Sequence, residues 1–462
     1  MKIKLTQPLT AQEIKTITKC TACTAIGATI YYIATHSSEV DRDTLFLALP
    51  GENSHGENYR TEVLARGGFL LTEKTGERSF TVSSVYDALF SLARAHIESL
   101  RSLKHTVAIT GSVGKTTTKE VLRIFLSQCF HTHATEGNQN SEIGMPLTML
   151  TAPLNTEILI LEMGMNHKGE IARLSTLAKP DYIIITNIGH AHIGNLGSRK
   201  AIAEAKTEIL VGAKENATVF IPAEEPLLAK LPNAKRIGLL SKEGDYVVLP
   251  ATIEDHIFMT DEKEFVYIPK KIKDRGMLSA IAFSCAVAME FGIPNDKISD
   301  KIRKFQYNKF RQSLHHCQGA KVNFDAYNAS YESVLCAIET LASTPAQTRI
   351  FLLGDMRELG THAEALHRAI GKKFASVKQR LDYLFLFGSH ASIVAEQAVN
   401  DGFDKAHIFV NTKEDQPQIT AYELLRYMKR GTYLHIKGAR GLQMERILHI
   451  LINQAGGDDN AG

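Results

Sequence analysis

Short apolar runs and amphipathic stretches alternate along this chain of 462 residues. A long amphipathic stretch over residues 85–100 predicts a helix that leads into a buried strand over residues 107–109. Before it, a small α/β module is expected, and we place this first domain at residues 1–83. The elements predicted in the module are a helix over residues 10–20 and strands over residues 28–33, 45–49 and 68–71.

Strands and helices alternate more regularly in the middle of the chain. The predicted strands lie at residues 157–161, 182–186 and 217–221, and the predicted helices at residues 168–177, 199–210 and 277–291. Such alternation is typical of a parallel sheet with helices on both faces. We therefore expect a second domain, with a parallel sheet, at residues 84–312.

The alternation starts again in the last third of the chain. The predicted strands lie at residues 322–324, 349–353, 383–387, 406–410 and 432–436. They indicate a second open parallel sheet, Rossmann-like in type, in a third domain at residues 313–462. Ligands bind such sheets at the carboxyl ends of the strands, where the turn-rich segments LGDMRELG and KGAR lie. The predicted fold class is α/β with three domains.

Composition narrows the classes of partner. Hydrophobic residues make up 44% and charged residues 22%, as in ordinary globular proteins. A formal net charge of +3 is too small to indicate a nucleic acid or an anionic membrane as a partner. No apolar run is long enough to cross a bilayer, so membrane insertion is not expected. Six scattered cysteines fit a reducing cytoplasm, and the pair Cys20 and Cys23 lacks the further ligands of a zinc site.

The strongest chemical signal is HTVAITGSVGKTTTKEV, at residues 105–121. Two glycines bracket a tight turn after an apolar strand, and a lysine followed by threonines begins a helix. Backbone N–H groups, the helix dipole, the lysine charge and a threonine hydroxyl together suit a polyphosphate with Mg²⁺. The loop is shorter than the common G-x-x-x-x-G-K-[ST], and a purely structural turn is the alternative. The residues expected to bind a nucleotide are Gly111, Ser112, Val113, Gly114, Lys115, Thr116 and Thr117.

Two further segments carry polar residues near predicted strand ends. Glu162 follows the strand ILIL, where an acid in a nucleotide site holds Mg²⁺; a helix-capping or solvated acid is the alternative. Asn138 and Asn140 lie among glycines in EGNQNSEIGMPLT. They suit a loop that lays amides along a polar substrate, although a turn-rich structural loop explains them equally well.

A histidine loop and a helix follow the next predicted strand. His190 and His192 lie in TNIGHAHIGNLGS, which follows a strand and is expected to meet the phosphate loop. Lys206 lies on the helix that comes next, and by itself it indicates only a solvated lysine. A role for His192 in binding a metal becomes the better interpretation only with the resemblance described next.

These segments together resemble the Mur ligases, the ATP-dependent enzymes that form amide bonds in the peptide stem of the bacterial cell wall. The resemblance covers almost the whole chain. The blocks that carry it are, in order, TLFLALPG, TGSVGKTTTKE, EGNQNSEIGMPLTML, EMGMNHKGEIARL, TNIGHAHIGNLGS with AEAKTEIL, DAYNASYESV, LLGDMRELG and IKGARGLQME. The blocks DAYNASYES and LLGDMRELG point to the branch of the family that adds D-alanyl-D-alanine.

The resemblance implies roles for individual residues. Lys115 is expected to grip the phosphates of ATP, with Thr116 and Glu162 on one Mg²⁺. His192 matches a ligand of a second Mg²⁺, and Lys206 matches a lysine that CO₂ carbamylates and that serves the same ion. The catalytic residues implied are therefore Lys115, His192 and Lys206.

The resemblance also implies roles for residues of the predicted third domain and for Arg311, which lies just before it. Arg311 and Asp325 match positions that hold the nucleotide. Lys437 and Arg440 match a KGSR-like loop near the dipeptide or the phosphates. Asn328, in the block DAYNASYES, is expected to bind substrate.

The expected activity is an ATP-dependent ligation that releases ADP and phosphate. UDP-N-acetylmuramoyl-tripeptide would bind the first domain, ATP the second and D-alanyl-D-alanine the third, in a cytoplasmic monomer. A sister Mur ligase or a folylpolyglutamate-type ligase that adds a single amino acid is the nearest alternative. A P-loop switch or motor that hydrolyses a nucleotide without an amine acceptor is an alternative of another class, and a non-enzymatic interaction module is a third.

Overall fold

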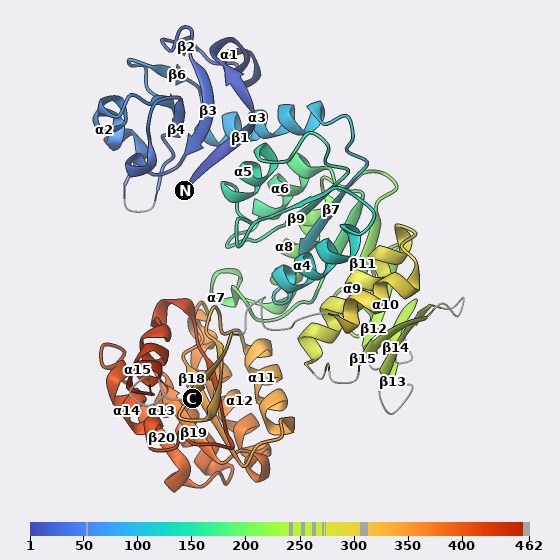
Figure 1. The fold of residues 1–462 in the computed structure, drawn as a ribbon, viewed down its shortest axis with the longest axis vertical. Coiled ribbons are helices and arrows are strands. Elements are labelled where there is room, and N and C mark those ends of the chain that lie inside the picture. Colours follow the sequence, from blue (N-terminus) through green and yellow to red (C-terminus); the bar gives the residue numbers. More distant parts are fainter. Residues whose placement is uncertain are drawn as a thin grey trace, which may run out of the picture. The chain divides into compact units, whose positions relative to one another are not determined.

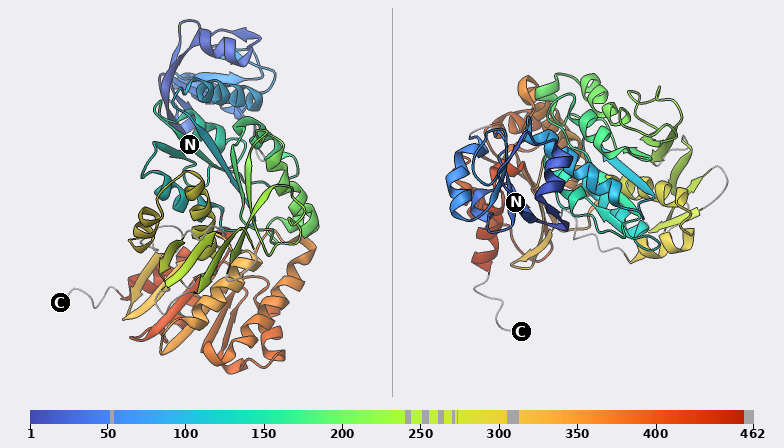
Figure 2. Two further views of the ribbon diagram at one scale, coloured as in Figure 1. Left: turned by 90° about the vertical axis from the view of Figure 1, so that its right-hand side faces the viewer. Right: turned by 90° about the horizontal axis from the view of Figure 1, so that it is seen from above.

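The computed structural model describes residues 1–51, 54–239, 244–250, 255–260, 265–269, 272, 274–304 and 313–455. The described strands form three sheets (Figures 1 and 2). The α/β class with three sheets is thereby confirmed, whereas the domain boundaries at residues 83 and 312 stay predictions. Within the described residues, every helix is too short or too polar to cross a membrane.

The chain divides into two compact units, each of which is described by itself. The first unit consists of Met1–Thr110, Arg123–Ile184 and Thr207–Val219. The second consists of Gly111–Leu122, Ile185–Lys206 and Phe220–Gly462. The phosphate loop, the histidine loop with its following helix, and the whole C-terminal sheet therefore belong to the same unit.

The N-terminal sheet has six strands in the order β1-β3-β4-β5-β6-β2. The inner strands β3 to β6 are parallel, and both edge strands are antiparallel to their neighbours. Phe46, Val63 and Leu70 are buried in its core. The strands are β1 (Lys2–Thr10), β2 (Ala22–Cys23), β3 (Thr29–Ala34), β4 (Thr44–Leu47), β5 (Phe69–Thr72) and β6 (Ser79–Thr81), and the helices are α1 (Ala11–Thr18), α2 (Arg60–Ala65) and α3 (Val85–Ser99).

The edge strand β1 is absent from the sequence prediction. Only Leu5 among its nine residues is buried, so the strand carries almost no apolar signal. Its position depends on backbone pairing with β3, which is interrupted by a shift of register between Lys4 and Leu9. Pairing with a distant strand cannot be read from local periodicity.

The central sheet has nine strands in the order β15-β14-β13-β12-β11-β10-β7-β9-β8. Strands β7 and β9 are parallel, as predicted, and β8, which the sequence prediction lacks, is parallel to β9. The strands are β7 (His105–Thr110), β8 (Thr132–Ala134), β9 (Ile158–Glu162), β10 (Tyr182–Ile185), β11 (Thr218–Pro222), β12 (Ala234–Leu239), β13 (Tyr246–Pro250), β14 (Asp255–Thr260) and β15 (Phe265–Pro269). The helices are α4 (Lys115–Leu126), α5 (Gly144–Leu150), α6 (Glu170–Ala178), α7 (Ile193–Leu196), α8 (Arg199–Thr207), α9 (Arg275–Glu290) and α10 (Asn295–Arg303).

Strands β12 to β15 extend this sheet beyond the prediction, which has no strand between β11 and the helix α9. Strand β14 is antiparallel to both β13 and β15. Val248, Phe258 and Val266, one from each of these three strands, are fully buried. Isolated buried positions in short strands give a weak pattern compared with the continuous apolar runs of the parallel strands.

The C-terminal sheet has six strands in the order β16-β17-β21-β18-β19-β20. Strand β16 is antiparallel to β17, so the sheet is mixed at one edge and parallel elsewhere. The strands are β16 (Ser313–Cys317), β17 (Ala320–Asp325), β18 (Thr348–Gly354), β19 (Tyr383–Phe387), β20 (Ile408–Asn411) and β21 (Thr432–Lys437). The helices are α11 (Tyr331–Ser343), α12 (Ala363–Ser376), α13 (Ala391–Asn400), α14 (Pro417–Leu425) and α15 (Glu445–Ala455).

The strand order of the C-terminal sheet brings the carboxyl ends of β17, β21 and β18 together. The chain moves outward through β17, β18, β19 and β20, and then returns to insert β21 between β17 and β18. Right-handed crossovers accordingly put α11 and α12 on one face and α14 and α15 on the other (Figure 1). Lys437, at the end of β21, is paired in register with Asp325 on one side and Leu353 on the other.

A buried histidine in β21 makes the stability of this sheet depend on pH. The His435 ring stacks on Phe351, with 5.1 Å between centroids, and its Nδ1 lies 3.1 Å from Asn323 Nδ2. Burial lowers the pKa of His435 to about 4. The folded chain therefore keeps the ring neutral at pH values where the unfolded chain binds a proton.

We expect the free energy of unfolding to fall as the pH falls from about 6.5 to about 4, by roughly 3 kcal/mol from this group. Urea unfolding across this range, followed by circular dichroism, measures the dependence. The His435→Gln variant should lack this part of the slope, whereas His449→Gln, which changes an exposed histidine, should keep it. Equal slopes in the two variants would contradict the prediction.

Candidate functional site

The phosphate loop connects β7 to α4 in a conformation that requires glycine. Gly111 has φ +146° and Gly114 has φ +86°, in the region that residues with a Cβ rarely adopt. A Cβ at Gly111 would also lie 1.9 Å from Thr186 Oγ1. The two glycines that stand out in the sequence are therefore needed to form this turn.

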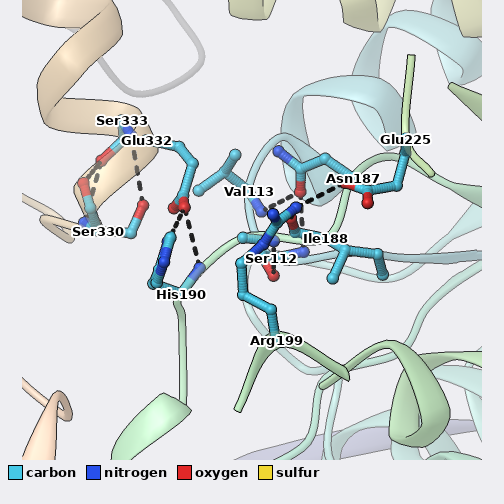
Figure 3. A network of polar contacts seen from close by, with 11 residues as sticks. Ser112, Val113, Asn187, Ile188, His190, Arg199, Glu225, Ser330, Glu332 and Ser333 are labelled. Carbon is cyan, nitrogen blue, oxygen red and sulfur yellow. Dashed lines mark hydrogen bonds and ion pairs between the residues drawn. The ribbon is translucent and has the colours of Figure 1, made fainter. Parts of the chain in front are cut away.

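Hydrogen bonds already organise the loop. Lys115 Nζ donates to the carbonyl of Gly111 at 2.7 Å, so the lysine folds back over the loop. The backbone N–H groups of Ser112 and Val113 both donate to Asn187 Oδ1, each at 3.0 Å (Figure 3). The amide oxygen of Asn187 thus accepts from the kind of N–H donors that bind phosphate in loops of this type.

The segment that follows β10 supports the loop from the side. Thr186 Oγ1 donates to the carbonyl of Val113 at 2.6 Å. Arg199 Nη2 donates to the carbonyl of Ile188 and to Glu225 Oε2, both at 2.8 Å (Figure 3). The histidine loop is therefore attached to the phosphate loop, as the sequence predicts.

Glu162 lies at the carboxyl end of β9, in register with Ile109 of the neighbouring strand β7. Its side chain is almost completely buried, with 1% of the residue exposed. Oε1 accepts a hydrogen bond from Asn140 Nδ2 at 2.8 Å, and the backbone N–H donates to Thr135 Oγ1 at 2.9 Å. Asn140 therefore contacts the acid, whereas Asn138 lies exposed in the same loop.

The other carboxylate oxygen of Glu162 fits a hard metal ion. Oε2 is buried without a hydrogen-bond partner. A buried carboxylate oxygen is costly unless a hydrogen bond or a cation compensates it, and Mg²⁺ prefers oxygen ligands of this type. The capping alternative has no support, because Glu162 ends a strand.

His192 stands at the start of α7 with φ +64°. Its Nδ1 lies 2.9 Å from Glu358 Oε2, and this contact, with burial opposing it, lowers the pKa of the Glu358 carboxyl. His192 and the phosphate loop are in the same compact unit. The structure therefore shows an acidic partner for His192 that the sequence did not suggest.

Lys206 is the most unusual predicted residue. It lies on α8 and is almost fully buried, with 1% exposed, instead of solvated as an isolated helical lysine would be. Burial first, and the positive charge of Lys115 second, lower its pKa well below the usual value. A neutral amine is the form that reacts with CO₂, so this environment suits carbamylation.

Three residues assigned in the C-terminal domain come together at the ends of β17 and β21. Lys437 is 3% exposed, and its Nζ donates to Asp325 Oδ2 at 2.8 Å and to the carbonyl of Asn328 at 3.2 Å. Arg440 stands apart, with a side chain that is 70% exposed and 3.5 Å from Glu445. Arg311 lies outside the described residues.

A polar cluster organises the turn LGDMRELG after β18. Asp355, His367 and His390 bring ligand-type atoms within 4.8 Å of one another. However, His367 Nε2 accepts from the backbone N–H of Met356, and its Nδ1 lies 2.7 Å from a carbonyl of α12. The two imidazole rings also stack face to face, 4.5 Å apart, so their in-plane lone pairs do not converge on one ion. The cluster shapes the turn and is poorly suited to a metal.

Sequence reasoning missed two acids that contact the histidine loop. Glu332 accepts from His190, and Glu358 pairs with His192. Both lie in blocks that the resemblance highlights, DAYNASYES and LLGDMRELG, but at positions where an exposed helical or loop acid is the ordinary interpretation. Two histidines preceding a helix gave the only available signal that acids would be needed nearby.

Models of protein families match two parts of the chain. The Mur ligase middle domain matches residues 109–263, and the Mur ligase glutamate ligase domain matches residues 311–440. The UDP-N-acetylmuramoyl-tripeptide–D-alanyl-D-alanine ligase of Bacillus subtilis is 32% identical over 441 residues, which cover 92% of this chain and 93% of that protein. The chain therefore belongs to the Mur ligase family.

Other similar proteins carry the same description. The UDP-N-acetylmuramoyl-tripeptide–D-alanyl-D-alanine ligase of Escherichia coli is 26% identical, with 92% of this chain and 94% of that protein covered. The crystal structure of MurF ligase from Thermotoga maritima in complex with ADP has a TM-score of 0.78 at 28% identity, covering 92% and 98% of the two chains. A structure of MurF from Acinetobacter baumannii has a TM-score of 0.85 at 24% identity over 98% and 100%, and shows the shared fold.

Proposed function

We propose that this chain joins D-alanyl-D-alanine to UDP-N-acetylmuramoyl-tripeptide with ATP, releasing ADP and phosphate, in the cytoplasmic synthesis of peptidoglycan precursors. The observation that carries the proposal is similarity along more than nine tenths of both chains to ligases of that name. The presence of the phosphate loop, the buried Lys206 and the Asp325–Lys437 pair in one compact unit supports the proposal.

The reaction has two steps. In the first, the γ-phosphoryl group of ATP passes to the terminal carboxylate of the tripeptide, and an acyl phosphate and ADP form. In the second, the amine of the dipeptide attacks the acyl carbon, the bond to phosphate breaks, and the amine loses a proton as the amide forms. Lys115 offsets the repulsion between the two anions in the first step, which is where phosphoryl transfer most needs positive charge.

Two Mg²⁺ ions fit the residues of this chain. Thr116 and Glu162 would hold one, and His192 and carbamylated Lys206 would serve the other. When bound, Mg²⁺ neutralises charge on the phosphoryl oxygens. The unpartnered Oε2 of Glu162 and the depressed pKa of Lys206 support these assignments.

The three substrates are assigned to the three predicted domains. Residues 1–83 would bind the nucleotide sugar, residues 84–312 ATP, and residues 313–462 the dipeptide. Arg311 and Asp325 would contact the nucleotide from the C-terminal side. The residues proposed to bind the other substrates are Asn138, Asn140, Asn328, Lys437 and Arg440.

The requirement for substrates tests the assignment directly. We expect phosphate release from ATP only when both the UDP-linked tripeptide and D-alanyl-D-alanine are present, because the acyl phosphate must form and then be captured. A coupled assay for inorganic phosphate measures the release, and mass spectrometry identifies the amide product. Equal turnover with free D-alanine or L-lysine as the only amine would favour a sister ligase, and turnover with ATP alone would favour a nucleotide switch.

A further inference from the structure

Glu332 makes a close contact with the histidine loop. Its Oε1 accepts from the backbone N–H of His190 at 3.0 Å and lies 2.5 Å from His190 Nδ1 (Figure 3). The carboxylate also covers Gly189, where an added Cβ would come within 2.5 Å of Glu332 Cδ. The ring of Tyr331 meets the His190 ring edge-on, with 5.1 Å between centroids. Two consecutive residues of α11 therefore enclose His190.

The start of α11 is built to present this acid. Ser330 is the N-cap residue, and its side chain accepts from the backbone N–H of Ser333, while Ser333 Oγ accepts from the backbone N–H of Ser330. This reciprocal cap fixes the first turn of the helix, which carries Tyr331 and Glu332. Figure 3 shows Glu332 extending from that turn toward His190.

The contact continues from His190 to the phosphate loop. The backbone N–H of Gly189 donates to Ser112 Oγ at 2.8 Å. Two residues earlier, Asn187 Oδ1 accepts from the N–H groups of Ser112 and Val113. The segment from Asn187 to His190 is therefore bonded to the phosphate loop at Asn187 and Gly189, and to Glu332 at His190.

A second contact holds the same loop farther along. The backbone N–H of Gly194 donates to the carbonyl of Glu358 at 3.0 Å, and Gly194 and Gly360 pack so closely that neither could carry a side chain without displacement. His362 Nε2 also lies 3.2 Å from the carbonyl of Gly197. Loss of Glu332 would therefore remove the hydrogen bonds between α11 and His190, next to the phosphate loop, while leaving the later part of the histidine loop attached.

We propose that Glu332 is a positioning residue for nucleotide binding. By fixing Gly189 and His190, it keeps Ser112 and its neighbouring N–H groups in the arrangement that the phosphates of a nucleotide need. The Glu332 carboxylate contacts both the backbone N–H and Nδ1 of His190. A hydrogen bond to a charged acceptor is stronger than one between neutral groups. The inference rests on the proposed function only in requiring that the phosphate loop bind a nucleotide.

The test measures ADP affinity of the full chain by calorimetry, without the other substrates. We expect Glu332→Ala to weaken ADP binding about tenfold, in line with loss of a hydrogen bond to a charged group. Glu332→Gln should weaken it by about threefold, because the amide oxygen still accepts from the His190 N–H. The matched control is Glu339→Ala, on the same helix, which removes an acid that pairs instead with Lys373 at 2.7 Å and should leave ADP affinity unchanged.

A double variant separates positioning from general loosening. Ser112→Ala removes the hydroxyl that joins Gly189 to the phosphate loop, so it interrupts the same path as Glu332→Ala. The double variant should have about the same ADP affinity as whichever single variant binds ADP less tightly. The two changes are not additive because both interrupt the path from Glu332 through Gly189 to Ser112. Multiplicative losses, or wild-type ADP affinity in Glu332→Ala, would overturn the proposal.

The thermal unfolding temperature without nucleotide identifies a merely structural effect. This temperature should stay close to that of the wild type in Glu332→Gln. If the variants lose ADP affinity only in proportion to a lower unfolding temperature, Glu332 is not a positioning residue. If Glu332→Ala does not fold, the isosteric Glu332→Gln decides the question by its ADP affinity alone. Failure of the ligation assay with an intact effect on ADP would refute the proposed function and leave this inference standing.

Discussion

Replacement of Lys115 by alanine is expected to slow ligation on the order of 10³-fold, as removal of a charge clamp does in other phosphoryl transfers. The ammonium group lies over the phosphate loop, 2.7 Å from the carbonyl of Gly111, and is well placed to meet the transferring phosphoryl group. Its loss leaves the apolar core intact. The rate of ADP formation with all three substrates at saturation measures the effect.

The control for this variant is Lys200→Ala, which removes an exposed lysine on α8 and should leave the rate unchanged. Thermal unfolding of both variants establishes that each is folded. A folded Lys115→Ala protein that ligates at nearly the normal rate would show that the loop is only structural.

If Lys206 is carbamylated as proposed, its replacement by alanine should reduce ligation on the order of 10²-fold or more, because the anionic carbamate would be lost. At neutral pH an ordinary lysine is almost entirely protonated, with a pKa of about 10.4. Burial and the charge of Lys115 lower the pKa of Lys206 well below that value. In the proposed carbamylation, the neutral amine would attack CO₂, a nitrogen–carbon bond would form, and a proton would leave to give the carbamate anion.

Two measurements distinguish the carbamate from a buried amine with a structural role. Acetate or formate should partly restore the activity of Lys206→Ala by supplying the missing carboxylate. Wild-type enzyme equilibrated with ¹³CO₂ should give a carbamate carbon signal that is absent from Lys206→Ala and unchanged in Lys200→Ala. No signal in the active wild-type enzyme, together with no rescue, would rule out carbamylation.

Local sequence carried most of the information about strands β7, β9, β10 and β11 of the central sheet and about the C-terminal sheet, but not about β8 or β12 to β15. Continuous apolar runs predicted the parallel strands β7, β9 and β18, because both faces of such strands are buried. Segments with one weakly buried face, such as β1, left no comparable pattern. The antiparallel pairing of β16 with β17 likewise depends on a partner strand and not on either segment alone.

The sequence by itself determined the turn that forms the phosphate loop. Gly111 and Gly114 adopt backbone conformations that glycine permits, and Lys115 follows at the start of a helix, so the local chemistry is contained in a few consecutive residues. The position of Glu162 at the carboxyl end of a buried strand was equally readable, although the predicted strand ends one residue earlier. These features are local, and local patterns specify them.

Only the tertiary structure decided which side chains meet. In the sequence, Lys206 looks like any other helical lysine. In the folded chain, packing excludes water from it and places it near the charge of Lys115, and both effects lower its pKa. Glu332 and Glu358 come within bonding distance of His190 and His192 across more than 140 residues of sequence. Burial and long-range pairing arise when distant elements pack, and no local periodicity encodes them.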